Sequence, residues 1–223
     1  MRQLILRVPQ QGEIAIVLLG AFGLFFLNNA LFLVHPTATP PISQQHLEFL
    51  LIFESIILAL LCSLLYVRGW TIERIGLHPT VRDTLIGLGL VPAFYLVYVF
   101  VWWIVYTAGY RPSYLGHYQV LVHSSIALPV AASVCIVNPV YEETFLCGYI
   151  ITTAKGLNRT TAGVNVSVAV RLACHLYQGG AGVLGIVPVG LIFAWWYART
   201  GRLWPLFVAH AVLDAIGLMW FVR

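Results

Sequence analysis

The sequence predicts an all-α fold: a polytopic transmembrane helical bundle of seven spanning helices, with eight as the alternative. Of the 223 residues, 60% are hydrophobic and 9% are charged, whereas a soluble domain carries about 25% charged residues. The mean hydropathy is +0.88. Apolar stretches of about 20 residues, the length that crosses a bilayer, recur along the chain. Residues 1–223 are therefore expected to form a single integral membrane domain.

The apolar stretches give the spans in order, because prolines interrupt the chain after the first stretch and glycines separate the later ones. The predicted spans are Ile14–Val34, Leu47–Val67, Thr84–Ala108, Val120–Val137 running on towards Cys147, Thr161–Tyr177, Gly182–Ala198 and Trp204–Val222. The first is expected to be a retained helix, since its apolar run is long enough to span and shows no signal-peptide cleavage pattern.

The dipeptide Asn138-Pro139 leaves the number of spans open. Proline is well tolerated in a first helical turn, so Val140–Ala154 could form an eighth span. Charge favours seven, because an eighth span moves four basic residues to the outside. With seven spans and a cytoplasmic N-terminus, nine of the twelve basic residues lie inside: Arg2, Arg7, Arg68, Arg74, Arg82, Lys155, Arg159, Arg199 and Arg202. This excess fits the positive-inside rule, and the net charge of +4 reports orientation rather than nucleic-acid binding.

Several reactive side chains have ordinary interpretations. The cysteines lie in apolar segments without a CxxC pair, which predicts buried free thiols rather than a disulfide framework or a zinc motif; they are Cys62, Cys135, Cys147 and Cys174. Glu54, in the second span, has no partner visible in the sequence and is interpreted as a helix-packing or protonated group. His117 and His123, at a span boundary, are interpreted as solvated.

A second set of ionisable residues falls inside the later apolar segments. Glu142 and Glu143 are adjacent, and His175, His210 and Asp214 follow. A buried carboxylate must be paired, hydrogen-bonded, protonated or wetted, so ionisable groups within membrane segments indicate function by default. Their spacing adds geometry, because residues four apart share a helical face. Such pairs are Glu143 with Cys147, Arg171 with His175, and His210 with Asp214. Three helices could aim these pairs at one place, so Glu142, His175 and His210 are expected to line one cavity.

These residue types suit hydrolysis by an activated water. A carboxylate and an imidazole can together hold a water and take its proton as it attacks a carbonyl. A second histidine, His210, can donate a hydrogen bond to the oxyanion, and Asp214 can orient that ring. No serine or cysteine nucleophile is needed.

The motifs resemble those of the CAAX prenyl protease and bacteriocin-processing family, also called the Abi family. Its first motif is two glutamates followed by an arginine four residues on. Its second is a histidine with an aromatic residue four positions before it, and its third is a histidine followed four residues later by asparagine or aspartate. The counterparts are Glu142-Glu143, His175, and His210 with Asp214, within residues 126–217. The resemblance implies a metal-independent, glutamate-dependent intramembrane endopeptidase without a cofactor. By that match Glu142 and His175 activate water, while His210 and Asp214 form the oxyanion site.

Two positions depart from the family pattern. Cys147 stands where the arginine is expected, and Arg171 stands where the aromatic residue is expected. We hypothesise a swap, in which Arg171 supplies from a neighbouring helix the cation that Cys147 lacks. Its expected partner is Glu143 first and Glu142 second, because a guanidinium within hydrogen-bond reach keeps a carboxylate ionised.

The expected partners are membrane lipid and a peptide or membrane-anchored protein substrate. The chain resembles bacterial members of the family, which implies a place in the bacterial inner membrane and favours peptide processing or self-immunity over CAAX cleavage. Three alternatives remain open. A catalytically inactive relative could act as a membrane scaffold or immunity protein. A proton-coupled transporter would relay protons through the carboxylates, although the chain shows no inverted repeat. A metal could be held by Glu142, His175 and His210, although no HExxH motif is present.

Overall fold

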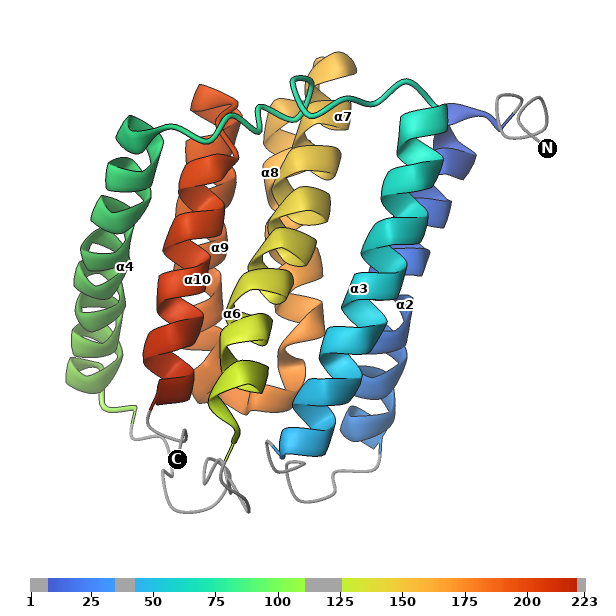
Figure 1. The fold of residues 1–223 in the computed structure, drawn as a ribbon. Coiled ribbons are helices and arrows are strands. Elements are labelled where there is room, and N and C mark those ends of the chain that lie inside the picture. The colour runs from blue at the N-terminus through green and yellow to red at the C-terminus, as the bar shows by residue number, and fades with distance from the viewer. Residues whose placement is uncertain (1–7, 35–42, 111–125, 220–223) are drawn as a thin grey trace.

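The computed structural model describes residues 8–34, 43–110 and 126–219, and within them every regular element is a helix (Figure 1). The all-α class is confirmed. The described chain forms seven helical rods: α2 (Gln10–Val34), α3 (Gln44–Val67), α4 (Val81–Thr107), a continuous rod of α6 (Leu128–Glu143), η1 (Thr144–Tyr149) and α7 (Ile150–Gly156), then α8 (Thr160–Cys174), α9 (Gly179–Thr200) with the short η2 (Leu176–Gln178) before it, and α10 (Trp204–Met219).

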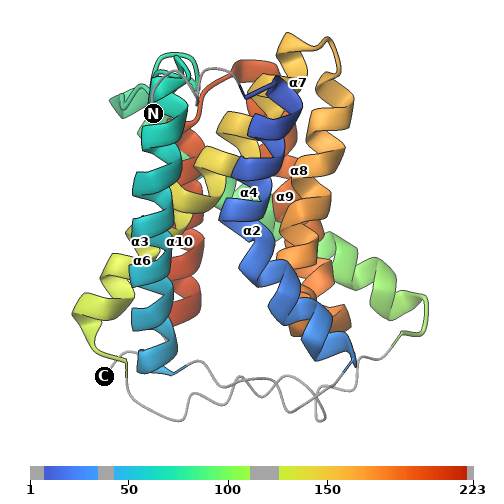
Figure 2. The same cartoon turned by 90° about the vertical axis from the view of Figure 1, so that its right-hand side faces the viewer.

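The rods pack in two layers. One layer has the order α4, α10, α6, α3, and the other has the order α9, α8, α2, with α7 packed on α8 (Figures 1 and 2). Contacts of α2 with α3 and of α4 with α9 close the two edges. The α6–α7 rod contacts both layers, so residues near its middle can meet side chains from α8, α10, α2 and α3.

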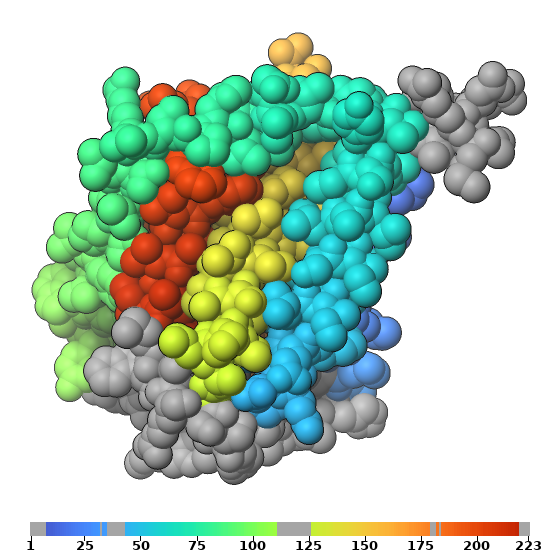
Figure 3. All heavy atoms as spheres, viewed as in Figure 1, coloured from blue at the N-terminus to red at the C-terminus, as the bar shows by residue number. Residues whose placement is uncertain are grey.

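Helix exposure identifies the α6–α7 rod as the centre of the bundle. In an apolar 18-residue stretch of the span Leu128–Gly156, 67% of the residues are buried, whereas the corresponding shares in α2, α3 and α4 are 22%, 17% and 11%. Figure 3 shows α6 flanked by α3 on one side and α10 on the other. The outer helices expose large apolar side chains such as Leu19, Leu60 and Leu96. Because these side chains would be unfavourable in water, they form the lipid-facing surface of an integral membrane protein.

The number of spans is confirmed only in part. Four helices are long and apolar enough to span: Gln10–Leu31, Gln44–Val67, Val81–Thr107 and Leu128–Gly156. The apolar stretches Leu184–Thr200 and Trp204–Leu218 are shorter. α8 has 15 residues, about 22 Å at 1.5 Å per residue, which is less than the hydrocarbon thickness of about 30 Å.

One sequence expectation about the fourth span is wrong. The helix begins at Leu128 rather than Val120, since Ile126 and Ala127 precede it in non-helical form and a proline occupies its first turn. The alternative of a separate eighth span does not hold, because Pro139 lies inside one continuous rod that ends at Gly156. The described residues do not include Val222, His117 or His123. The end of the last span and the solvated state of the two histidines therefore remain predictions.

Helix ends follow local chemistry. Ser43 caps α3 by accepting from the backbone N–H of His46 at 3.2 Å, and Thr80 caps α4 by accepting from that of Asp83 at 3.0 Å. Gly201 ends α9 at φ 65°, a left-handed conformation that favours glycine. The backbone N–H of Leu203 then donates to the Gly76 carbonyl at 3.0 Å. These contacts fix the ends of α3, α4 and α9, and thus the depth of the residues between them.

Candidate active site

The two adjacent glutamates lie at an irregularity in the central rod. Pro139 has no N–H, so it cannot donate to the carbonyl four residues earlier. One turn later, the chain adopts a π-helix over Thr144–Tyr149, and single π turns frequently mark functional sites. Glu142 and Glu143 occupy the junction. The Glu142 side chain is 13% exposed, whereas that of Glu143 is fully buried.

Arg171, from α8, bridges both carboxylates. Its Nη1 atom lies 2.9 Å from Oε2 of Glu142, and its Nη2 atom lies 2.6 Å from Oε1 of Glu143. The planar guanidinium can donate to two carboxylates at once, which a lysine ammonium cannot do with the same geometry. Cys147 donates from Sγ to Oε2 of Glu143 at 3.3 Å. The expected pairing of Arg171 with Glu143 is therefore present, and the second-choice partner Glu142 is engaged as well.

His210, from α10, completes the surroundings of Glu143. Its Nδ1 atom lies 2.7 Å from Oε1 of Glu143, and its Nε2 atom lies 3.5 Å from Oδ1 of Asp214. Only the imidazolium form has donors on both ring nitrogens, so this form suits two carboxylate neighbours. Glu143 thus receives contacts from Arg171, Cys147 and His210, and its oxygens are held entirely within the bundle.

His175 lies just past the end of α8. Its Nδ1 atom lies 2.7 Å from the backbone oxygen of Arg171. Since a carbonyl only accepts, Nδ1 carries the proton, and Nε2 of the neutral ring is then an acceptor. Nε2 lies 3.9 Å from Oε1 of Glu142. One water can lie within hydrogen-bond distance of both atoms, which is the arrangement that general-base activation of water requires.

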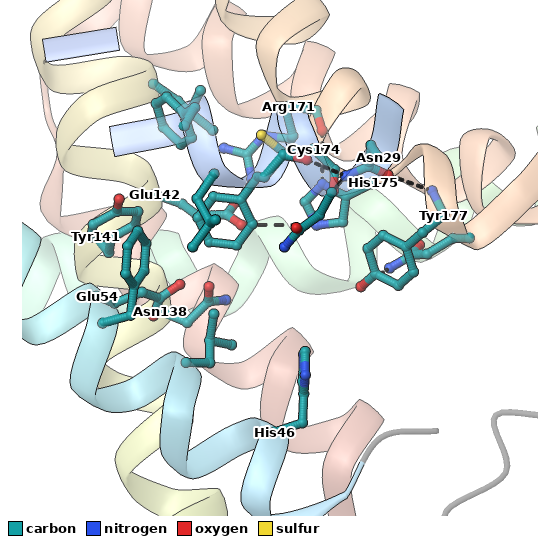
Figure 4. Close-up of a pocket in the computed structure, with 18 of the residues that line it drawn as sticks. Asn29, His46, Glu54, Asn138, Tyr141, Glu142, Arg171, Cys174, His175 and Tyr177 are labelled. Atoms are coloured by element: carbon teal, nitrogen blue, oxygen red, sulfur yellow. Dashed lines mark hydrogen bonds and ion pairs between the residues drawn. The ribbon is translucent and has the colours of Figure 1, made fainter. Parts of the chain in front are cut away.

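A cavity of about 340 Å³ opens beside this pair (Figure 4). Its ionisable lining residues are His46, Glu54, Glu142, Arg171, His175 and Asp214. Glu143 and His210 do not line it. The expectation that Glu142, His175 and His210 face one cavity is therefore correct for the first two only. Carboxylate oxygens of Glu142 and Glu143 and a ring nitrogen of His210 still lie within 4.8 Å of one another. His210 therefore lies directly behind the cavity wall.

Part of the chain matches a known protein family. Residues 124–216 match the family of type II CAAX prenyl endopeptidases, Rce1-like. The match confirms the resemblance expected from the motifs, and the segment contains the whole ionisable cluster: Glu142, Glu143, Arg171, His175, His210 and Asp214. No curated protein and no solved structure matches the chain.

The Rce1-like segment also contains a cavity residue that the sequence motifs did not single out. Asn138, one turn before Glu142, donates from Nδ2 to Oδ2 of Asp214 at 3.0 Å. This contact holds the Asp214 carboxylate at the cavity wall. A polar asparagine beside a proline within an apolar helix was the available signal, but it was interpreted as a possible helix boundary.

Two further residues lie outside the Rce1-like segment. Asn29, in α2, donates to the Cys174 carbonyl at 3.0 Å and accepts from the backbone N–H of Tyr177 at 2.7 Å. It thereby fixes the backbone on both sides of His175. Glu54, in α3, lines the cavity and is 2% exposed. Both are polar residues in apolar spans, and their meeting with the cluster depends on helix packing that the sequence does not reveal.

A resident metal suits this donor set poorly. Among the described residues, Glu142, Glu143 and His210 are close enough together to ligate one ion. However, the Arg171 guanidinium already donates to both carboxylates. A divalent ion beside them would meet that positive charge or displace it into an apolar surrounding.

Proposed function

We propose that the protein is an intramembrane endopeptidase in which Glu142 and His175 activate the attacking water. The Rce1-like match supports a peptidase of this class. The observation that carries the mechanism is the 3.9 Å separation between Oε1 of Glu142 and Nε2 of His175 at the cavity wall. In this mechanism a water between them loses a proton to Glu142 as its oxygen attacks the carbonyl carbon of the scissile peptide bond.

The Arg171 contact keeps Glu142 suited to this role. An ionised carboxylate is needed to accept a proton, and the guanidinium at 2.9 Å stabilises that form. Arg171 binds Oε2, so Oε1 remains directed towards His175. Glu143 shares the same arginine and fixes its position, which makes Glu143 a positioning residue rather than the base.

The oxyanion would be stabilised by donors near Asp214. His210 is the donor expected from the family resemblance, and its Nε2 atom faces Asp214 at the cavity wall. The Asn138 amide carries two N–H groups, and one of them donates to Asp214. Both ring nitrogens of His210 already face carboxylates, and the ring does not line the cavity. We therefore assign the oxyanion donor to the second N–H of Asn138, with Asp214 and His210 as positioning residues.

The substrate would be a peptide or a membrane-anchored protein segment. The apolar walls of the cavity, which include Phe22, Phe25 and Phe49, suit such a segment. The matched family's description names prenylated CAAX substrates, whereas we favour bacterial peptide processing or self-immunity for this chain. An activity assay should therefore include both kinds of peptide.

The test uses the purified full chain in detergent and in lipid nanodiscs. A peptide library containing farnesylated CAAX peptides and unprenylated leader-type peptides is incubated with the parent, Glu142→Gln and Glu73→Gln. Glu73 is an exposed loop carboxylate and serves as the matched control. Cleavage by the parent and by Glu73→Gln, with kcat lowered about 10²–10⁴-fold in Glu142→Gln, supports the proposal. Equal cleavage by Glu142→Gln, or none by the parent, overturns it, and the latter favours a membrane scaffold.

A further inference from the structure

Glu54 is the most isolated carboxyl group around the cavity. It lies near the middle of α3, is 2% exposed and lines the cavity beside the proposed water-activating pair. Across residues 8–34, 43–110 and 126–219, its carboxyl group makes no hydrogen bond or ion pair. An acidic side chain at this depth is costly for a helix to retain, so its presence at a reaction cavity calls for a role.

The immediate surroundings of Glu54 are apolar. Phe49 and Phe53, on the same helix, line the cavity beside it, and Phe53 packs edge-on against Phe25 of α2 at 5.8 Å. In Figure 4, the Glu54 carboxyl group lies next to Asn138 and below Glu142. The charged groups that interact with it electrostatically are Glu142, Asp214 and His210. Two of these three are carboxylates, so the site contains little to stabilise a further negative charge.

The contrast with Glu142 separates the two glutamates chemically. Glu142 has the Arg171 guanidinium at 2.9 Å, which stabilises a carboxylate. Glu54 has apolar rings and two carboxylates around it, while the nearby His210 is engaged by Glu143 and Asp214, and Asn138 donates to Asp214. A buried carboxyl group that makes no hydrogen bond or ion pair is more stable as the neutral acid. Two carboxyl groups whose environments differ in this way commonly divide the acid and base roles of a reaction.

Hydrolysis of a peptide bond needs both roles. When the water oxygen attacks, one water proton passes to Glu142 and a C–O bond forms. When the resulting oxyanion collapses, the C–N bond breaks and its electron pair remains on nitrogen, which is too basic to leave without a proton. A second, neutral acid in the cavity wall can supply that proton without waiting for Glu142 to transfer its own.

We propose that Glu54 is the general acid that protonates the leaving amine nitrogen, an assignment that rests on the proposed function. The products are a carboxylic acid and an amine. Glu54, left as a carboxylate, regains a proton from protonated Glu142 through cavity water, which returns both groups to their starting forms. The cavity of about 340 Å³ has room for substrate and such a water.

Leaving-group chemistry provides the test. A peptide cleaved by the parent is compared with its thiodepsipeptide, in which sulfur replaces the nitrogen of the scissile bond and the residues on both sides are unchanged. A thiolate leaves without protonation, since a free thiol ionises near pH 8.5. The proteins are the parent, Glu54→Gln, Glu54→Asp and Glu48→Gln. Glu48 is the matched control, because it lies on the same helix, accepts from Gln44 at 2.7 Å and does not line the cavity.

The expected result is specific to the peptide bond. Glu54→Gln should lower kcat on the peptide about 10²–10⁴-fold with KM little changed, and should cleave the thiodepsipeptide within about threefold of the parent. Glu54→Asp, which keeps the acid, should recover part of the peptide activity. Thermal unfolding in detergent checks that each variant is folded.

Other outcomes overturn the assignment in distinguishable ways. Equal loss on both substrates assigns Glu54 a structural role, even where Glu54→Gln is folded. Full peptide activity in Glu54→Gln shows that Glu142 delivers both protons, and leaves the proposed function standing. A parent that cleaves neither substrate removes the proposed function, and the assignment with it.

Discussion

The guanidinium of Arg171 lies 2.6 Å from the carboxylate of Glu143, across the boundary between α8 and the central rod. Both side chains are almost completely buried, at 2% and 0% exposure. The contact joins two helices that supply different parts of the proposed site: Glu142 comes from the central rod, and His175 follows α8. Loss of either partner should therefore affect stability and the alignment of the water-activating pair together.

The first prediction concerns the removal of this cation. Arg171→Ala should lower the free energy of unfolding by about 3–5 kcal/mol, because two buried carboxylates lose their common partner. Arg171→Lys should recover only part of that loss, since an ammonium group cannot reproduce the planar bridge. The measurement is unfolding in detergent by heat and by denaturant, with cleavage of a library peptide recorded in parallel.

Arg199→Ala is the matched control for this prediction. Arg199 is exposed and lies over the Trp195 ring at 4.2 Å, an interaction worth about 0.5–1 kcal/mol at such sites. If Arg171→Ala unfolds like the Arg199→Ala control and retains parental cleavage, the bridge is not the feature that holds the site.

The second prediction concerns the pair Asn138 and Asp214. Asn138→Asp places a carboxylate at the position that now donates at 3.0 Å, so like charges should weaken both stability and kcat. Adding Asp214→Asn reverses the pair and restores a donor opposite an acceptor. The double variant should be more stable than the sum of the singles predicts, with a coupling of about 0.5–3 kcal/mol.

A double-mutant cycle of unfolding free energies measures this coupling. Asn138→Ala provides a reference that removes the donor without adding charge. Additive effects of Asn138→Asp and Asp214→Asn would contradict the assigned hydrogen bond and its role in orienting the oxyanion site.

The sequence predicted helix type and order well, because long apolar runs leave a membrane chain few alternatives. The start of the fourth span was misplaced because the apolar pattern extends upstream of Leu128, whereas the proline in the first turn determines where the helix begins. Pro139 suggested a helix boundary, yet the helix continues through it. At this point α6 packs against both α3 and α10, and a π-helix follows. Composition records hydrophobicity, but it does not record which irregularities packing will tolerate.

In the candidate site, the sequence predicted contacts along one helix but not contacts between helices. Spacing by four correctly brought His210 to Asp214 and Cys147 to Glu143, since both are contacts along one helix. It could not reveal depth, so His210 was expected in the cavity and instead lies behind it. Glu54 and Asn29 meet the site only through packing of α3 and α2 against the Rce1-like segment, and no local pattern predicts such contacts.

The third prediction concerns metal removal. Because Arg171 already bridges the carboxylates that would bind an ion, activity should survive treatment with EDTA or 1,10-phenanthroline followed by gel filtration into metal-free buffer. The measurement is the initial rate of peptide cleavage, with residual metal determined by elemental analysis. Loss of activity that is restored by one equivalent of Zn²⁺ would instead indicate a metallopeptidase, and the Arg171 bridge would then have to open for binding.

The fourth prediction concerns the exchange of Cys147 and Arg171. The family pattern places an arginine four residues after the second glutamate, and here the sulfur of Cys147 already lies 3.3 Å from Oε2 of Glu143. An arginine at this position can therefore reach the same carboxylate along its own helix. Arg171→Phe then places an aromatic residue near Phe193, at the family's usual position.

Each single change should be harmful for a different reason. Arg171→Phe leaves Glu142 and Glu143 without their cation, which should cost about 3–5 kcal/mol. Cys147→Arg forces a second guanidinium into a fully buried position beside the first, where overpacking costs about 1–3 kcal/mol before repulsion is counted. The double variant leaves a single cation beside the carboxylates, which removes both the lost ion pair and the charge repulsion.

Unfolding free energies and peptide cleavage rates of the parent, the two singles and the double variant test the swap. We expect the double variant to recover most of the stability lost in Arg171→Phe and a measurable part of the cleavage rate, because one cation again faces Glu143. Recovery of stability without cleavage would indicate that contact of the cation with Glu142, and not only with Glu143, is needed for the reaction. A double variant no better than the sum of the two singles would show that positions 147 and 171 are not interchangeable sources of the cation.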